Sequence, residues 1–523
     1  MRNKILLLVI LFFSTTLKLF SQQSIDSKRD YQWLFGYRYS GNIYSNLMDF
    51  NTKPAKISSV NKKMFDISET LGQICTKDGK LLLYSLGCDI RDSSHNIIMN
   101  GDSLSYGSYW NLFCPNKIGL RLQQGLIILP KPNNPDKYLI FHVTTPEKIK
   151  SYAAKMMYSE VDMQKNNGKG LVTIKNKIII DDTLTYSNIS AVRHGNGRDW
   201  WVMIPEKSED ESNSHYYYTT LVTPDSIAKP FRQTAGKFIG AIQWDHDYSA
   251  FSSDGTKYAR LRSKEAVYLY DFDRNTGKLT NMRYAKLNAN AEIGGVAFSP
   301  NSKYLYVSSH YVMYQIDTEE KKLQDGVVVV GNYDNFKVND IFDTAFDAAF
   351  LAPDCKIYIN TFSSTEYLHL VNYPDRKGAA CGFEQRAIKL PTKVAWSLPN
   401  YPNFRLGKIG DNFSPCDSTI NAYIKDNTTS DASVTEKQIV ANLYPNPAAT
   451  DINLDLFGYI NQYKKGIFNL YDTQGNLAAT YPLLQNHDEY RFDISNLTNG
   501  MYFWHLVLDD KVRQTGKVVV MKE

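Results

Sequence analysis

One short unit recurs along most of this 523-residue chain and limits the folds that the chain can adopt. Its clearest copy is GGVAFSPNSKYLYVSSHYVMYQID, Gly294 to Asp317. Val296 and Phe298 alternate with small residues, a Ser-Pro-Asn-Ser turn follows, and Tyr304 to Val307 is rich in aromatic and β-branched residues. This pattern is typical of a β-hairpin. A third strand is expected at Val312 to Ile316, so the unit is a small antiparallel sheet that needs similar neighbours to bury both faces.

The turn before the aromatic strand occurs six times along the chain. Its six copies are aligned at Lys80, Lys137, Asp199, Lys257, Lys303 and Lys356. Successive copies are 57, 62, 58, 46 and 53 residues apart, which is close to the roughly 40 to 50 residues of a β-propeller blade. A further strand that ends in a polar turn follows four of them, at residues 158–170, 268–279, 314–323 and 369–378. Four strands per repeat at this spacing predict an all-β fold with a β-propeller.

Two segments outside the six repeats are expected to complete the propeller. Trp33 to Asn51 precedes the first repeat and Val394 to Gly407 follows the last. If both form one seventh blade, the two ends of the domain lock the ring of blades shut. A parallel β-helix and a string of β-sandwiches are the alternatives, but β-helix repeats are shorter and sandwiches do not repeat the turn.

Composition supports β-structure and argues against two classes of partner. The chain has 36 Tyr and 25 Phe, which favour strands. Cross-strand packing is the preferred interpretation of the tyrosines, and an aromatic sugar-binding platform is the alternative. Lys and Arg (59) exceed Asp and Glu (54) by only 5, so neither nucleic acid nor an anionic membrane is expected as a partner.

The N-terminus is expected to be a signal peptide covering residues 1–21. Arg2 and Lys4 precede the apolar run Ile5 to Phe13, and Ser21-Gln22 offers a cleavage point. Polar residues interrupt the run before it reaches the length of a membrane span. No transmembrane segment is expected elsewhere in the chain.

Six cysteines in an exported chain permit disulfides. They are Cys75, Cys88, Cys114, Cys355, Cys381 and Cys416. The chain contains no CxxC motif, so the cysteine spacings fit no zinc site. Six cysteines allow 15 complete sets of disulfide pairs. Proximity along the chain favours Cys88 with Cys114 and Cys355 with Cys381.

The repeat region resembles a group of exported propellers. The motifs WLFG and MDF, CTKDGKLLLYSLGC, HNIIMNGD, GLIILPKP, APDCKIYI and SLPNYPNFRLG are similar to propellers that precede sorting tails in proteins of the type IX secretion system. The resemblance covers Trp33 to Gly407. It implies a fold and no activity.

The last part of the chain is expected to be a separate small domain. Residues 411–441 are rich in Thr, Ser, Asp and Asn and predict a linker. Strand-like runs then alternate with turns to the end of the chain, which predicts a small immunoglobulin-like β-sandwich over residues 442–523. The expected propeller occupies residues 31–410.

This C-terminal stretch closely resembles the type A sorting domain of the type IX secretion system. The resemblance rests on YPNP, NLYDTQG, DISNLTNGMY and GKVVVMK. The matched motif residues are Tyr444, Pro445, Asn446, Pro447, Gly500, Tyr502 and Lys517. It implies export through the periplasm and outer membrane by the type IX machinery, with the protein released or held at the cell surface. An ordinary adhesive sandwich is the alternative.

Two motifs imitate functional sites out of context. Gly101 to Leu104 spells GDSL, but the only Asp-x-x-His spacing, Asp92 to His95, lies upstream of Ser103, so catalysis by Ser103 is not expected. The run from Asp271 to Gly277 imitates a calcium loop with its glycine one place late, and a polar hairpin turn is expected there.

The remaining titratable residues give no signature of a metal or a cofactor. His194, His246 and His310 are interpreted as turn or packing residues. Asp245, Asp247 and Asp347 lie near the starts of blades, where carboxylates from different blades meet if the rim of a channel forms there.

The preferred hypothesis is a secreted or surface propeller that binds a protein or a glycan through loops at one end of the ring, without catalysis. The alternative is a polysaccharide hydrolase or lyase on the same scaffold. Acidic side chains that meet at the channel within about 5 to 10 Å would favour the enzyme.

Overall fold

A computed structural model gives the fold of the chain. It describes residues 27–39, 42–60, 67, 69–148, 152–185, 188–207, 214–237, 239, 248–262, 265–287, 294–396, 398–418, 420, 440–457, 465–484, 489–509 and 511–522. The proposed signal peptide and most of the proposed linker therefore lie outside the described residues. The chain divides into two compact units, the second built mainly from residues 426–523.

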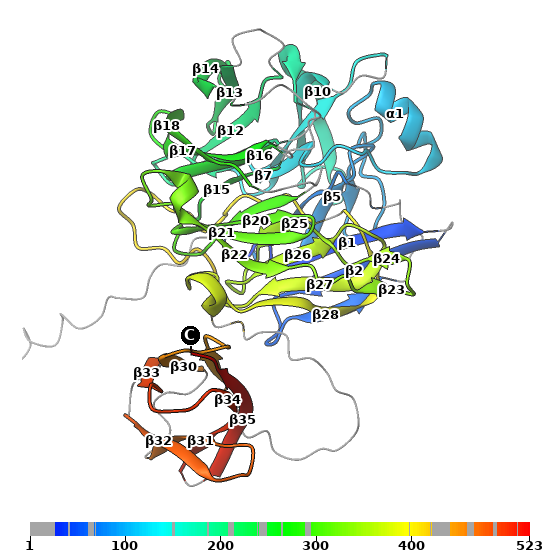
Figure 1. Ribbon diagram of the computed structural model, residues 1–523. Helices are drawn as coiled ribbons and strands as arrows, with labels where there is room; N and C mark the ends of the chain where they lie inside the picture. The colour runs from blue at the N-terminus through cyan, green and yellow to red at the C-terminus, as the bar shows by residue number, and fades with distance from the viewer. Residues whose placement is uncertain are drawn as a thin grey trace, which may run out of the picture. The chain divides into compact units, whose positions relative to one another are not determined.

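The first unit consists of successive antiparallel sheets (Figure 1). An N-terminal sheet of three strands contains β1 (Gln32–Tyr39), β2 (Asn42–Asp49) and β3 (Lys56–Ser59), and the next contains β4 (Gly72–Cys75), β5 (Leu81–Ser85) and β6 (Arg91–Asp92). Five four-stranded sheets follow: β7 (Leu126–Pro130), β8 (Lys137–Thr144), β9 (Ala153–Asp162) and β10 (Leu171–Leu184); β11 (Ser190–Arg193), β12 (Trp200–Pro205), β13 (Ser214–Val222) and β14 (Phe231–Lys237); β15 (Tyr248–Phe251), β16 (Lys257–Arg262), β17 (Ala266–Asp273) and β18 (Lys278–Ala285); β19 (Gly295–Phe298), β20 (Tyr304–Ser309), β21 (Val312–Asp317) and β22 (Val327–Asn332); and β25 (Phe346–Leu351), β26 (Ile357–Thr361), β27 (Thr365–Val371) and β28 (Phe383–Val394).

Short elements lie between these strands. They are the helix α1 (Ser108–Phe113), the hairpin β23 (Lys337–Val338) and β24 (Phe342–Asp343), and the 3₁₀ turns at Cys114–Asn116, Leu323–Gly326 and Gly378–Cys381. No helix in the described residues is long and apolar enough to cross a membrane.

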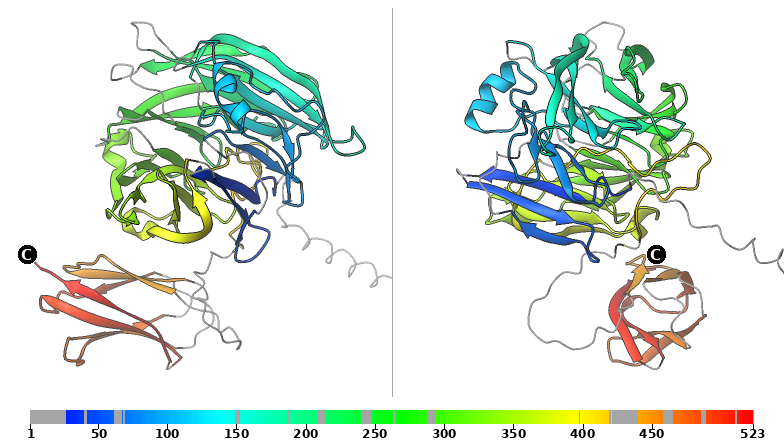
Figure 2. Two further views of the ribbon diagram at one scale, coloured as in Figure 1. Left: turned by 90° about the vertical axis from the view of Figure 1, so that its right-hand side faces the viewer. Right: turned by 180° about the vertical axis from the view of Figure 1, so that it is seen from behind.

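The sheets follow one another around the first unit, from blue through yellow in Figures 1 and 2. We call the strand that comes first in each sheet its first strand. The first strands of neighbouring sheets contact each other: β11 contacts β15, β15 contacts β19, and β19 contacts β25. Gly295 shows how close this approach is: a Cβ added there would lie 2.4 Å from the backbone nitrogen of Ala349. The first strands are buried on both faces, which explains apolar runs such as Leu126–Pro130.

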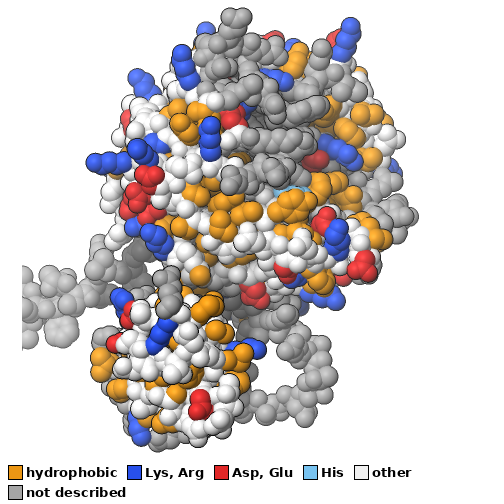
Figure 3. All heavy atoms as spheres, in the orientation of Figure 1, with side chains coloured by type: hydrophobic (Ala, Val, Ile, Leu, Met, Phe, Trp, Pro, Cys, Tyr) orange, Lys and Arg blue, Asp and Glu red, His pale blue; other side chains and the backbone are white. Residues whose placement is uncertain are grey.

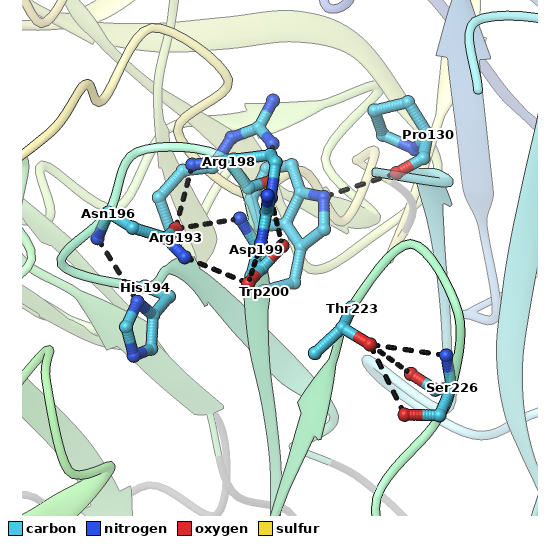
Figure 4. Close-up of polar contacts among 9 residues, drawn as sticks. All are labelled: Pro130, Arg193, His194, Asn196, Arg198, Asp199, Trp200, Thr223 and Ser226. Carbon is cyan, nitrogen blue, oxygen red and sulfur yellow. Dashed lines mark hydrogen bonds and ion pairs between the residues drawn. The ribbon is translucent and has the colours of Figure 1, made fainter. Parts of the chain in front are cut away.

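All six predicted turns connect the first and second strands of a sheet. Figure 4 shows the turn between β11 and β12, where the Asn196 amide donates to Asp199 at 2.8 Å. The Arg193 guanidinium lies 3.8 Å from the centre of the Trp200 ring. The Trp200 indole N–H donates to the carbonyl of Pro130 in the neighbouring sheet at 3.2 Å. The turn residues therefore also join one sheet to the next.

The prediction that Val394–Gly407 supplies part of a seventh blade is wrong. Residues 32–59 form the three-stranded N-terminal sheet by themselves, and β28 ends at Val394. Residues 395–407, here called the crossing segment, form no strand in the part that the structure describes. Pro399 and Pro402 lack the amide donors that a central strand needs.

The N-terminal sheet nevertheless joins the last four-stranded sheet to the β4 sheet. The Asn46 side chain on β2 accepts from the amide of Thr392 on β28 at 3.1 Å. On the other side, the Gln73 side chain on β4 accepts from the Leu34 amide and donates to its carbonyl, both at 3.0 Å. The N-terminal sheet therefore contacts both the last four-stranded sheet and the β4 sheet, so contacts between sheets link the end of the series of sheets to its beginning.

The crossing segment runs among the first strands from their starts to their ends. Near the starts of β7 and β11, the Asn400 side-chain amide donates to the carbonyls of Leu126 and Ile189 at 3.1 and 3.0 Å. Near the opposite ends, Arg405 makes a two-pronged ion pair with Asp30 at 2.8 and 2.7 Å. The segment therefore occupies the space between the first strands.

Two disulfides are present, and one differs from the sequence prediction. The bond between Cys88 and Cys114 is confirmed. The predicted pairing of Cys355 with Cys381 is wrong, because Cys355 bonds to Cys416 and Cys381 is a buried free thiol. Chain proximity failed here because Asp417 donates its backbone N–H to the carbonyl of Pro353 at 2.6 Å, which brings Cys416 beside the turn after β25.

The second unit contains two antiparallel sheets that share one hydrophobic core. One sheet consists of β29 (Val440–Tyr444), β30 (Asp451–Phe457) and β33 (Glu489–Asp493), and the other of β32 (Leu477–Leu483), β31 (Gly466–Tyr471), β34 (Gly500–Leu508) and β35 (Lys511–Val520). Tyr502 and Trp504 on β34 are buried, while Met501 and Phe503 are exposed. Side chains of this strand therefore alternate between the core and the solvent.

Candidate functional site

The motifs that the sequence analysis set aside are parts of loops and turns. Ser103 lies in the loop before α1, where its hydroxyl donates to Asp102 at 3.2 Å. Asp273 accepts hydrogen bonds from the Asn275 backbone and the Thr276 hydroxyl, so the calcium-like run is a polar turn between β17 and β18. No group of three or more His, Cys, Asp or Glu residues within the described ranges is placed to hold a metal ion.

The predicted channel acids are only partly described. Asp347 is the second residue of β25, whereas Asp245 and Asp247 lie outside the described residues, as does His246. His194 is in the turn between β11 and β12 and His310 in the turn between β20 and β21, as predicted.

Asp347 is the most unusual polar residue of the first unit. Its side chain is completely buried, and neither carboxylate oxygen makes a hydrogen bond of good geometry with the described residues, although the Ala348 N–H and the Asn360 amide lie nearby. Burial raises its pKa to about 7, although the nearby Asn360 amide and the Ala348 N–H oppose this rise. Asp347 lies in a break of register between β25 and β26, opposite Asn360. Both side-chain atoms of Asn360 likewise lack a partner in the described part of the chain.

Glu69 lies near this pair and comes from a different sheet. It immediately precedes the β4 sheet, and burial raises its pKa to about 7 while Arg121 opposes the rise. The charge of Glu69 also raises the pKa of Asp347 and of Tyr248, the first residue of β15. The starts of three sheets thus bring Glu69, Tyr248 and Asp347 into one electrostatic neighbourhood.

An amide bridge holds these strand starts in place. The Gln124 side chain, just before β7, donates to the Ser249 carbonyl at 2.9 Å and accepts from the Ser249 N–H at 2.9 Å. Both bonds are buried, and the side-chain amide bonds to the N–H and the carbonyl of Ser249 as a backbone amide on a neighbouring strand would. We refer to the region around the starts of the first strands as the strand-start end.

Four residues of this region, Glu69, Tyr248, Asn360 and Gln124, were not predicted from the sequence. Glu69 had a usable signal, because it lies directly before a predicted first strand, as the candidate aspartates do. Nothing in the sequence shows that the Gln124 side chain reaches Ser249, 125 residues further along the chain.

The interior beside the crossing segment is too small for a large ligand. A cavity of about 110 Å³ is lined by small residues of the first strands, including Ser190, Ser249 and Ala349, and by Asn400. Ligand pockets are typically about 300 to 1,000 Å³, so this cavity suits a few water molecules. A large ligand therefore does not fit inside this cavity.

The sorting-motif residues lie at the junction of the two sheets of the second unit. Tyr444 ends β29, and Pro445, Asn446 and Pro447 connect it to β30. The Asn446 side chain accepts from the Val519 N–H at 2.9 Å and donates to the Lys517 carbonyl at 3.2 Å. The connection is therefore fixed to β35.

The other motif residues lie on β34 and β35. Gly500 begins β34 and pairs with Val520. The Tyr502 hydroxyl donates to the Thr498 carbonyl at 3.0 Å. Lys517 pairs with the exposed Phe503. These contacts show how the motif stabilises the unit.

Comparison with known proteins identifies the C-terminal part of the chain. Residues 442–521 match the family described as a secretion system C-terminal sorting domain. With the motifs named above, this match implies export by the type IX secretion system and either secretion or attachment to the cell surface. No curated protein matches the sequence.

Several solved structures align with the chain at low similarity. A protein from Lactobacillus plantarum has 10% identity and a TM-score of 0.34, over 88% of this chain and 99% of that chain. A glucose dehydrogenase has 10% identity and a TM-score of 0.31, over 65% of this chain and 95% of the other. Sqt1 from Chaetomium thermophilum has 10% identity and a TM-score of 0.32, over 71% and 89%. Such low scores support no conclusion about this protein.

Proposed function

We propose that this exported protein is a ligand-binding β-propeller carried by an immunoglobulin-like sorting domain. The propeller spans residues 31–410 and has seven blades, which are the N-terminal sheet and the six sheets that begin with β4, β7, β11, β15, β19 and β25. Residues 411–441 are the linker and residues 442–523 the sorting domain. Sheet contacts that return from β28 to β2 support the ring.

The ligand is a protein or a glycan, and it binds at the strand-start end without being chemically changed. The observation that supports this proposal is the buried pair of Asp347 and Asn360, whose side-chain polar atoms make no hydrogen bond of good geometry with the described residues. Leaving such groups unpaired costs roughly 1 to 3 kcal/mol each. Natural proteins keep that cost mainly where function requires the groups. A ligand hydroxyl or amide supplies the missing hydrogen bonds.

The variant Asp347→Ala tests this role because binding and folding predict opposite effects. The mature protein should lose at least about tenfold in affinity for its ligand, found by a glycan array and a screen of surface proteins, when hydrogen bonds to Asp347 are removed. Its free energy of unfolding should stay equal or rise, because the Asp347 side chain is a buried carboxyl without a well-formed hydrogen bond to the described residues. The control Asp199→Asn changes a turn at the opposite ends of the first strands and should leave affinity unchanged. Unchanged binding with lower stability in Asp347→Ala would assign Asp347 to the fold alone.

The alternative function is hydrolysis or elimination on a polysaccharide. The electrostatic coupling of Glu69 and Asp347 favours it, because two carboxyls with different roles form the usual machinery of glycosidases. Incubation with polysaccharides should then release reducing ends, or unsaturated products that absorb in the ultraviolet. Glu69→Gln should abolish this release, and an absence of product from the wild-type protein rejects the alternative.

A further inference from the structure

A row of aromatic rings borders the proposed ligand site. His310 and Tyr311 lie in the turn between β20 and β21, with ring centres 4.3 Å apart. Tyr311 stacks on Tyr333, which follows β22, at 5.8 Å. His310 also contacts Phe362, between β26 and β27, at 5.0 Å, and Phe362 contacts Trp396 at 5.9 Å. We call these five rings the aromatic ledge.

The ledge adjoins the buried pair of Asp347 and Asn360. The carbonyl of His310 accepts from the N–H of Phe346, the residue before Asp347, at 2.7 Å. Phe362 lies two residues after Asn360 and donates its N–H to the Ala345 carbonyl at 3.0 Å. The ledge therefore lies directly beside the backbone segments that carry Asp347 and Asn360.

Part of the ledge and its surroundings is open to solvent. Tyr311 is 46% exposed, and the nearby hairpin presents Phe336 and Ile341 at 43% and 69%. In the orientation of Figure 1, β20, β25 and this hairpin face the viewer, and Figure 3 shows hydrophobic side chains gathered there beside a histidine. Exposed apolar groups that cluster in this way usually mark binding surfaces.

Buried polar groups without partners belong to the ring-bearing residues or to residues close to them in the sequence. They are His310 Nδ1, Trp396 Nε1, Ser309 Oγ and Ser364 Oγ, none of which has a hydrogen-bond partner among the described residues. His310 is itself only 8% exposed. The exposed ring of Tyr311 matches a sugar chain, whose C–H faces are apolar.

The charges around the ledge are already engaged. Arg386 pairs with Asp334 at 2.9 Å, Lys337 pairs with Asp343 at 3.2 Å, and Lys393 lies 5.3 Å from the centre of the Phe342 ring. Cations engaged in this way are poor partners for an acidic polymer. We propose that the aromatic ledge binds a neutral polysaccharide, with a pyranose ring against the exposed face of Tyr311 and the chain continuing along the neighbouring apolar side chains.

This inference rests on the proposed function and specifies its ligand. The test is affinity electrophoresis of the mature full-length protein in gels containing neutral polysaccharides (xyloglucan, galactomannan or a β-1,3-glucan) or acidic ones (alginate or polygalacturonate). At least one neutral polysaccharide should retard the wild-type protein, and the acidic ones should not.

Variants at Tyr311 locate the binding on the ledge. Tyr311→Ala should weaken binding about tenfold because it removes the exposed ring, whereas Tyr311→Phe, which keeps the ring, should bind within about twofold of the wild type. Tyr284→Ala removes a 41% exposed tyrosine from β18 and serves as the matched control, with no expected loss. Thermal unfolding of each variant separates lost binding from lost folding.

The results distinguish this inference from the proposed function. Retardation by a neutral polysaccharide that Tyr311→Ala leaves intact but Asp347→Ala removes overturns the ledge and keeps the strand-start site. Binding only to a protein, or only to acidic polysaccharides, also overturns the neutral-glycan assignment while the proposed function stands. If no glycan and no surface protein binds the wild-type protein, both proposals fail.

Discussion

At the scale of single residues, the protein keeps polar groups where packing alone would favour apolar ones. Asp347 and Asn360 lie inside the strand-start end without partners among the described residues. In the β7 sheet, by contrast, His142 is equally buried but bonds to the hydroxyls of Ser105 and Ser159 at 2.9 and 3.3 Å. The contrast separates a buried polar residue whose hydrogen bonds are made within the fold from one whose side chain lacks them, which is the basis of the proposed ligand site.

The raised pKa of Asp347 predicts a dependence of stability on pH. Its folded-state pKa of about 7 lies above the value near 4 expected for the unfolded chain. The folded state therefore binds the proton more tightly, and the stabilisation is full below about pH 4 and lost as the pH rises to about 7.

Urea unfolding at pH 5 and pH 7 measures this dependence. Between these values the wild-type protein should lose about 2 kcal/mol more unfolding free energy than Asp347→Asn. Other groups titrate in both proteins, so their contributions largely cancel in the difference. Equal losses in the two proteins would show that the Asp347 carboxyl is ionised in the folded state.

At the scale of elements, the crossing segment replaces the strand that the sequence predicted. Asn400 bonds to the starts of β7 and β11, and Arg405 pairs with Asp30 near the opposite ends. The Cys355–Cys416 bond then attaches the end of this path to the turn after β25. The segment that leads toward the sorting domain is thus fixed to the first unit.

The disulfide pattern predicts which cysteines remain reactive. After denaturation without reductant, alkylation should modify two thiols, those of Cys75 and Cys381. Peptide mapping should find Cys355 linked to Cys416.

Removal of that bond should destabilise the first unit. Cys416→Ser opens a loop of 61 residues, and the chain-entropy relation gives a loss of about 4 kcal/mol. Cys381→Ser is the matched control, since it breaks no disulfide and should cost less. A Cys355–Cys381 peptide would contradict the assignment.

At the scale of the whole molecule, the repeated turns and hairpins could be predicted from the sequence, but the path of the crossing segment, which occurs once, could not. The six turns and their hairpins follow from local residue chemistry, such as Ser-Pro-Asn-Ser before Tyr304, and all were found between the expected strands. The path of residues 395–407 depends on contacts with partners far along the chain, for example Asn400 with Leu126, 274 residues away. Periodicity carries no information about such contacts.

The candidate site was predictable only in part for the same reason. Asp347 was recognisable because it begins a predicted first strand. Its neighbours Glu69 and Asn360 come from another sheet and from the next strand, and only folding brings them together. The signal peptide at residues 1–21 lies outside the described residues and stays a prediction.

The central claim is that the C-terminal unit carries a ligand-binding first unit out of the cell. It is tested most directly by comparing the location of the full-length protein with that of a variant lacking residues 443–523. Cell fractionation with immunodetection should find the full-length protein at the surface or in the medium, and the shortened protein folded in the periplasm with its ligand affinity intact. Delivery of the shortened protein to the surface at normal levels would contradict the account.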